Sequence, residues 1–145
     1  MVYLLAALRP HAADLQKLVL LDYALVYSGD LDGPTSLHTP VPFRGGELMS
    51  RRELIQQGLY IMSTRGLVDV TADETGISYI AGPAALTLVG SITAEYFRAL
   101  EQRCIWVSNR YAGQNSDALV REFSEKGHLW GAEIESYGAK EQLWQ

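Results

Sequence analysis

Between residues 51 and 81, the pattern of apolar and polar positions predicts a helix, a strand, a polar turn and a second strand. In the first part every third or fourth residue is apolar, which places these side chains on one face of a helix. The predicted stripe comprises Ile55, Leu59 and Met62, and we expect Leu48 and Ile61 to widen it. Gly66 after Arg65 predicts the end of the helix, because a cation suits the last turn and glycine readily takes a positive φ.

The hairpin is predicted from two segments rich in β-forming residues. Residues 67–71 (LVDVT) and 77–80 (ISYI) are the expected strands, with Val68 and Val70 on one face. Residues 72–76 (ADETG) are polar and end in glycine, which is typical of a hairpin tip. A helix followed by such a hairpin is the second half of a winged helix-turn-helix domain. The alternative is another α+β domain with one hairpin packed on a helix.

Helices are predicted for most of the remaining chain. Residues 3–8 suggest a short strand or helix, and residues 11–27 suggest a helix with Asp14 in its first turn. Residues 31–47 contain three prolines and predict a long loop where a winged helix should have its second helix. This loop weakens the DNA-reading version of the motif.

Three more helices are expected after the hairpin. Pro83 starts the first, which breaks at Gly90, and Ser91 is expected to cap the second. The face predicted for this second helix, which ends near Tyr111, comprises Ile92, Tyr96, Ala99, Arg103 and Val107. Asn115 or Ser116 is expected to cap the last helix, which bears Leu119 and Phe123.

These elements predict a mostly helical α+β fold. We expect one winged helix-turn-helix-like domain with additional C-terminal helices over residues 1–131, because 145 residues suit a single domain. Residues 132–145 form a tail that we expect to dock on this domain or on a partner. No run of about 18 apolar residues indicates a membrane span. The lone Cys104 excludes an intrachain disulfide and favours a reducing, cytoplasmic setting.

The residues that carry chemistry in enzymes are scattered in this sequence. His11, His38 and His128 stand apart, whereas a metal site needs clustered ligands. Cys104 lies in an apolar helical segment, where burial makes a thiol inert. We therefore predict no catalytic residue, cofactor or metal site, and no enzyme. A small enzyme with an unrecognised site is a weaker alternative.

Basic residues near the central helix raise the question of DNA binding. In a DNA-binding winged helix, Arg44, Arg51 and Arg52 would contact nucleic acid together with Gln56 and Gln57. However, the net charge is −5, and DNA-gripping domains are usually basic. The acidic residues that flank this face or occupy the predicted hairpin tip are Glu47, Glu53, Asp73 and Glu74. We favour a solvated or ion-paired face, and we expect Asp22 to be solvated or paired with an arginine.

The first long helix has an excess of apolar surface. Its second half, residues 18–27, is apolar on every side except at Asp22. Such a helix lies either at the centre of the core or against a partner chain. We predict a protein interface that combines this helix with the proline-rich loop and the C-terminal aromatics. The candidate residues are Leu18, Tyr23, Tyr27, Phe43, Trp130 and Trp144.

Several strings resemble one known family. They are LRPHAADLQKLVLLDYALVYSGD, GPTSLHTPVPFRGGELMSRRELIQQGLYIMSTRGLV, and GISYIAGPAA followed later by LEQRCIWV. They resemble the small middle component of bacterial ABC three-component antiphage systems, which overlap the Lamassu type. The resemblance covers the chain to about Trp130.

The resemblance implies a role and two partners. The partners are an SMC-like ABC ATPase and an effector, and no cofactor or membrane is implied. The middle component would bridge or brace the ATPase and restrain the effector until invading DNA is sensed. We therefore predict a non-enzymatic adaptor subunit that touches DNA weakly or only within the complex. The alternative is a winged-helix DNA-binding protein or transcription regulator.

Overall fold

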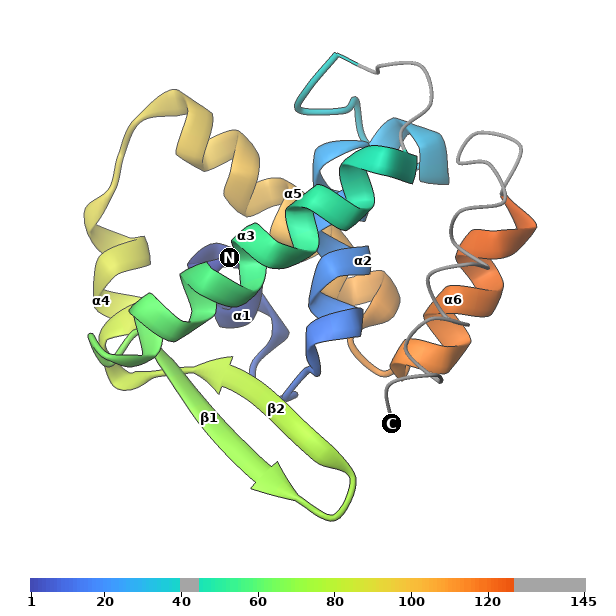
Figure 1. Ribbon diagram of the computed structural model, residues 1–145. Coiled ribbons are helices and arrows are strands. Elements are labelled where there is room, and N and C mark those ends of the chain that lie inside the picture. Colours follow the sequence, from blue (N-terminus) through green and yellow to red (C-terminus); the bar gives the residue numbers. More distant parts are fainter. Residues whose placement is uncertain (40–44, 127–145) are drawn as a thin grey trace.

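The structure is a computed structural model that describes residues 1–39 and 45–126 (Figure 1). The described helices are α1 (Val2–Leu8), α2 (Leu15–Val26), η1 (Ser28–Leu31), α3 (Gly45–Ser63), α4 (Pro83–Ser91), α5 (Glu95–Tyr111) and α6 (Ser116–Glu125). The described strands, β1 (Val68–Asp73) and β2 (Gly76–Ala81), form one antiparallel hairpin. The prediction of a mostly helical protein with a small antiparallel sheet is confirmed.

Helix α2 lies at the centre of the molecule. Helices α3, α5 and α6 all contact α2, and they surround it in Figure 1. Its apolar residues are therefore buried on every side; Leu18, Leu20 and Leu21 have no exposed surface. Burial of this many large aliphatic side chains is the main stabilising contribution to such a fold. The almost uninterrupted apolar run of α2 thus reflects a central position in the core.

The N-terminal residues show whether the first element is a strand or a helix and where α2 begins. Residues 3–8 belong to a helix, α1, which packs on α5. The next helix, α2, begins at Leu15, later than predicted, because the carboxylate of Asp14 accepts a hydrogen bond from the amide of Lys17 (2.7 Å) and caps the helix. Ala13 instead pairs with Tyr79 of β2 through two backbone hydrogen bonds, of 2.8 and 2.9 Å. This contact ties the hairpin to the start of α2.

The hairpin is longer than predicted. Its register runs from the pair Val68–Ala81 to the pair Asp73–Gly76, and the Asp73 carboxylate accepts a hydrogen bond from the Thr75 amide (2.8 Å) at the tip. Val68 is buried, whereas Val70, which was predicted to share its face, is 48% exposed. The reason is visible in Figure 1, where the hairpin extends away from the helices towards its tip.

The segment between α2 and α3 differs from a helix-turn-helix. Among residues 27–39 the structure has only η1 and irregular backbone, so the middle helix of that motif is not observed there. The segment packs on α5, because Arg103 of α5 donates two hydrogen bonds to the Thr35 carbonyl oxygen (2.9 and 2.7 Å). Gly33 lies so close to Trp106 that an added Cβ would be 2.3 Å from the indole ring.

The C-terminal helices confirm some predicted boundaries and correct others. Helix α4 ends at Ser91, whose hydroxyl donates to the Leu88 carbonyl oxygen (2.8 Å) instead of capping the next helix. Helix α5 starts only at Glu95, and the predicted face is wrong at Tyr96, which is 51% exposed. The buried side of α5 consists of Cys104, Val107 and Tyr111, with Phe97 and Leu100 partly buried beside them. The predicted Asn115 cap of α6 is confirmed, since its side chain accepts a hydrogen bond from the Ala118 amide (2.9 Å).

Candidate functional site

The outer face of α3 carries large apolar side chains that contact water. Leu54 is 68% exposed, Tyr60 is 73% exposed and Ile61 is 54% exposed. Leu59 on the same helix is fully buried, and Ile55 and Met62 are partly buried beside it, which confirms the predicted inner stripe. The expectation that Ile61 widens this stripe is wrong. At 3.6 residues per turn, a residue two positions after Leu59 lies about 200° further round the helix, on the opposite side.

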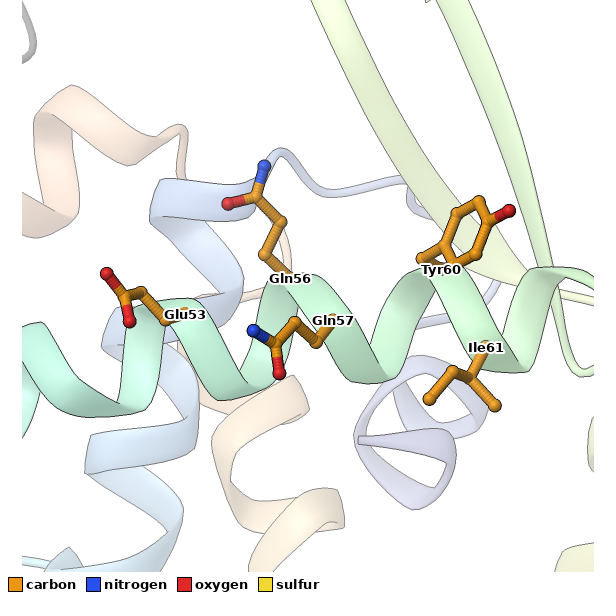
Figure 2. Close-up of a pocket in the computed structure, with 5 residues that line it drawn as sticks. All are labelled: Glu53, Gln56, Gln57, Tyr60 and Ile61. Carbon is orange, nitrogen blue, oxygen red and sulfur yellow. The ribbon is translucent and has the colours of Figure 1, made fainter.

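An open hollow flanks this outer face on one side. The hollow has a volume of about 440 Å³, and the described residues that line it are Glu53, Gln56, Gln57, Tyr60 and Ile61. Figure 2 shows these five side chains projecting from the solvent side of the helix, with Tyr60 and Ile61 one turn beyond the two glutamines. The surface therefore combines an aromatic ring and an aliphatic side chain with polar groups, which is the composition of many protein interfaces.

A second hollow, of about 270 Å³, flanks the other side of α3. Its described lining consists of Met1, Asp22, Arg51, Leu54, Ile55, Gly58 and Met62. At its edge, Arg51 forms an ion pair with Asp22 of α2, with Nη2 and Oδ2 2.7 Å apart. The two side chains are only 23% and 14% exposed, so the pair lies partly inside the fold. Of the two alternatives predicted for Asp22, solvation or pairing with an arginine, the structure has the pairing.

The predicted DNA-contact residues do not form one face. Arg51 turns towards Asp22 and lines one hollow, whereas Gln56 and Gln57 line the other. Arg52 is half-buried, and Arg44 lies outside the described residues. Arg51 is held by a carboxylate of its own chain, and this contact reduces its capacity to bind a phosphate.

The predicted protein interface needs a correction. Leu18 has no exposed surface, and Tyr23 and Tyr27 are 1% and 2% exposed, so none of the three projects outward. The reason is that α3, α5 and α6 together cover α2, which a pattern along one helix does not reveal. Phe43, Trp130 and Trp144 lie outside the described residues. The sequence did contain one indication of the exposed apolar face of α3. Leu54, Tyr60 and Ile61 are apolar, but their spacing does not place them on the same side of the helix as the inner stripe.

A buried lysine joins α2 to the turn between α5 and α6. Lys17 is 5% exposed, and its ammonium group donates hydrogen bonds to the carbonyl oxygens of Ala112 (2.8 Å) and Gln114 (2.6 Å). Burial lowers the pKa of Lys17, while the nearby Asp14 partly opposes this shift. Asp14 also accepts a hydrogen bond from Ser116 at the start of α6 (3.0 Å). An open hollow of about 410 Å³ lies beside this junction, but the polar groups of Lys17 and Asp14 are used within the fold.

The residues considered for chemistry lie apart in the structure. Cys104 is 1% exposed, and burial raises the pKa of its thiol to about 12, so the thiol stays protonated at neutral pH. The Nε2 atom of His38 lies 3.4 Å from the Tyr96 hydroxyl oxygen, and His11 is exposed between α1 and α2. His128 is outside the described residues. Within residues 1–39 and 45–126, no three His, Cys, Asp or Glu side chains are grouped closely enough to hold a metal ion.

The length and the apolar character of the described helices show whether any of them could cross a membrane. None of them combines the length and the apolar character needed to cross a bilayer. The longest, α3, is apolar on its inner stripe and partly apolar outside, but it carries Arg51, Arg52 and Glu53 in succession.

The class of protein defined by these observations is a small helical protein with a two-stranded hairpin and an exposed, partly apolar helix face. Residues 1–133 match the family model for the ABC-three component (ABC-3C) system Middle Component 2. Because this match spans most of the chain, the protein belongs to that family. No curated protein and no solved structure matches the chain. The family match therefore confirms that the chain is an ABC three-component middle component, as the resemblance of its sequence implied.

Proposed function

We propose that the chain is a non-enzymatic adaptor that holds an SMC-like ABC ATPase and an effector together in a cytoplasmic antiphage complex of the Lamassu type. The observation that carries this proposal is the family match over residues 1–133, because a middle component acts within a system of three components. The adaptor braces the ATPase and restrains the effector until invading DNA is sensed.

The outer face of α3 supports an adaptor role. Exposed aromatic and large aliphatic side chains anchor many protein interfaces, and Tyr60, Leu54 and Ile61 are of these types. They lie on a helix that is fixed to the core through Leu59 and through the Arg51–Asp22 ion pair. A rigid helix presents such side chains to a partner with little loss of conformational entropy on binding.

We further propose that α3 and the hairpin act as a winged-helix-like unit in protein contact. Direct reading of DNA is less well supported. The charges around the unit are unfavourable for DNA, because the tip carries Asp73 and Glu74, and hydrogen bonds from Thr75 lower the pKa of Asp73 and keep it ionised. The net charge of −5 acts in the same direction.

Co-expression of the three components of one system tests the adaptor proposal. With a tag on the ATPase, we expect the effector and this chain to co-purify with it, and we expect the effector to be lost when this chain is omitted. A complex of ATPase and effector that forms equally well without the chain would contradict the proposal.

A second measurement separates the adaptor from the DNA-binding alternative. Fluorescence anisotropy with a labelled DNA duplex should detect little or no binding by the isolated chain at physiological salt. Submicromolar binding with a steep salt dependence would instead support a DNA-binding protein, because phosphate contacts release counterions. In that case Arg52→Glu should abolish the signal.

A further inference from the structure

We infer that the outer face of α3 docks an amphipathic helix of another component of the system, which crosses α3 over Gly58. This inference rests on the proposed adaptor function and adds the kind of element that the adaptor recognises. It is carried by the arrangement of exposed side chains around Gly58, by the hollows on both sides of α3, and by the charges along its flanks.

Four residues on the outer face of α3 form a socket for one incoming side chain. Leu54, Gln57, Gly58 and Ile61 have the spacing i, i+3, i+4 and i+7, with which a helix surrounds a knob from a facing helix. Leu54 and Ile61 are more than half exposed, so the rim of the socket is apolar and open to solvent. Among the described residues, a Cβ atom added to Gly58 would meet only the Met62 methyl group, at 3.5 Å, so the space directly over Gly58 is otherwise open there.

The two hollows place grooves on either side of this row of residues. One is lined by Gln57, Tyr60 and Ile61, and the other by Leu54, Gly58 and Met62. Helices pack by fitting the ridges of one into the grooves of the other, and a helix with two open grooves suits this arrangement. An extended strand would need a sheet edge with unpaired backbone groups, which the middle of a helix does not offer.

The flanks of the socket define the charge of the partner helix. Arg51 lies one heptad before Gly58 on one flank of α3, Arg65 lies in the turn that directly follows the helix, and Glu53 and Tyr60 are seven residues apart on the other flank. Asp22 neutralises Arg51, whereas Arg65 and Glu53 are exposed. The complementary helix therefore carries large apolar residues at the centre, an acidic residue towards Arg65 and a basic residue towards Glu53.

A second copy of this chain fits the same surface less well. Two α3 helices crossing antiparallel at Gly58 would bring Arg51 of each copy towards Arg65, just after α3 of the other, and Asp22 can neutralise only one of the two cations. The part of α3 from Glu53 to its end at Ser63 is about 15 Å long at 1.5 Å per residue. A face of that length suits the recognition of a single helix in a groove.

Photo-crosslinking in the purified three-component complex tests where α3 binds. The photoreactive residue p-benzoylphenylalanine is placed at Leu54 and, separately, at Ile61. The control position is Leu86 on α4, which is 52% exposed. We expect both α3 probes to label one segment of the ATPase or the effector at positions three, four or seven residues apart, and the control to leave that segment unlabelled. Labelling of a second copy of this chain, or of positions spaced by two as in a strand, would overturn the inference.

Filling the socket tests its energetic role. Gly58→Leu should weaken binding to the immobilised ATPase–effector pair by about tenfold or more, which is the loss expected when a central contact is blocked. Gly90→Leu is the matched control, because Gly90 also lies in a helix, and no described residue comes within 4 Å of a Cβ added there. We expect the control to bind like the wild type. Thermal unfolding of both variants shows whether the fold is kept, since leucine has a higher helix propensity than glycine.

The outcomes distinguish the two proposals. If the three components assemble but Gly58→Leu and the wild type bind equally, the helix-docking inference is wrong while the adaptor function stands. If the chain never joins the other components, both are contradicted. Should Gly58→Leu fail to fold, Ile61→Glu with Leu86→Glu as its control gives the same comparison on exposed positions of α3 and α4.

Discussion

Arg51 of α3 reaches Asp22 of α2 with two guanidinium nitrogens, Nε and Nη2, each 2.7 Å from the same carboxylate oxygen. These residues are 29 positions apart in the chain, and their contact holds α3 against the central helix. It also places a neutralised arginine beside the apolar outer face of α3. The pair thus contributes to the stability of the fold and also lies at the edge of the proposed docking surface.

A double-mutant cycle should detect this contact. With Asp22→Asn, Arg51→Gln and the double variant, we expect a favourable coupling of about 1–3 kcal/mol in the free energy of unfolding, because the pair is partly buried and charge-assisted. Urea denaturation gives this value. The control pair is Lys126 and Asp32, also 2.7 Å apart, in which Asp32 is 82% exposed. Its coupling should stay below about 1 kcal/mol; equal couplings would contradict the prediction.

The buried Lys17 should matter more than an ordinary surface lysine. Lys17→Met leaves the carbonyl oxygens of Ala112 and Gln114 without their donor, which should cost about 1–3 kcal/mol in stability. We also expect faster hydrogen exchange in the turn between α5 and α6, because this turn loses its link to α2. Lys126→Met removes a more exposed lysine and should cost less than about 1 kcal/mol. A neutral Lys17→Met variant would show that the junction contributes nothing.

Two leucines on α3 give a matched comparison of its inner and outer faces. Leu59→Ala should lower the free energy of unfolding by about 2–5 kcal/mol, because Leu59 is fully buried and its removal leaves a cavity. Leu54→Ala should change stability by no more than about 0.5 kcal/mol, since Leu54 is 68% exposed. Chemical denaturation of the isolated chain measures both. Similar costs at the two positions would mean that the helix is rotated from the orientation described.

The single thiol should be unreactive in the folded protein. Because burial raises the pKa of Cys104 to about 12, we expect the thiol reagent DTNB to modify it at pH 8 only after unfolding in guanidinium. Between the pKa of the unfolded thiol and about pH 12, the folded state holds a proton that the unfolded state releases. This contribution to stability is therefore present below the unfolded pKa and is lost as the pH rises. Cys104→Ala should remove that part of the pH dependence, and rapid modification of the native thiol would contradict its burial.

Short-range features of the sequence determined much of the local structure. Helix α3 ends at Ser63, and Gly66 lies in the turn that follows with φ of +71°, which glycine takes without steric cost. The Asn115 side chain caps α6, and the spacing of Ile55, Leu59 and Met62 identified the inner face of α3. Each of these depends on residues within one or two turns of each other, so a local pattern contains the necessary information.

Other features depend on contacts between distant segments. The segment before α2 is extended at Ala13, which pairs with Tyr79, a residue 66 positions away in the chain, and α2 then begins at Leu15 after the Asp14 cap. The buried side of α5 follows from its packing on α1 and α2, which placed Tyr96 in solvent. In both cases the competing local choices differ by little in energy, and a tertiary contact decides between them.

The candidate site shows the same division. The sequence alone determined that the chain has more apolar surface than an ordinary helix face needs, and that it resembles an ABC three-component middle component. Only the tertiary structure decided which apolar residues are left in water. Helices α3, α5 and α6 bury Tyr23 and Tyr27 of α2, while the outer side of α3 keeps Leu54 and Tyr60 exposed. The physical reason is that burial is a property of how several elements pack together, and the periodicity of one element does not specify its neighbours.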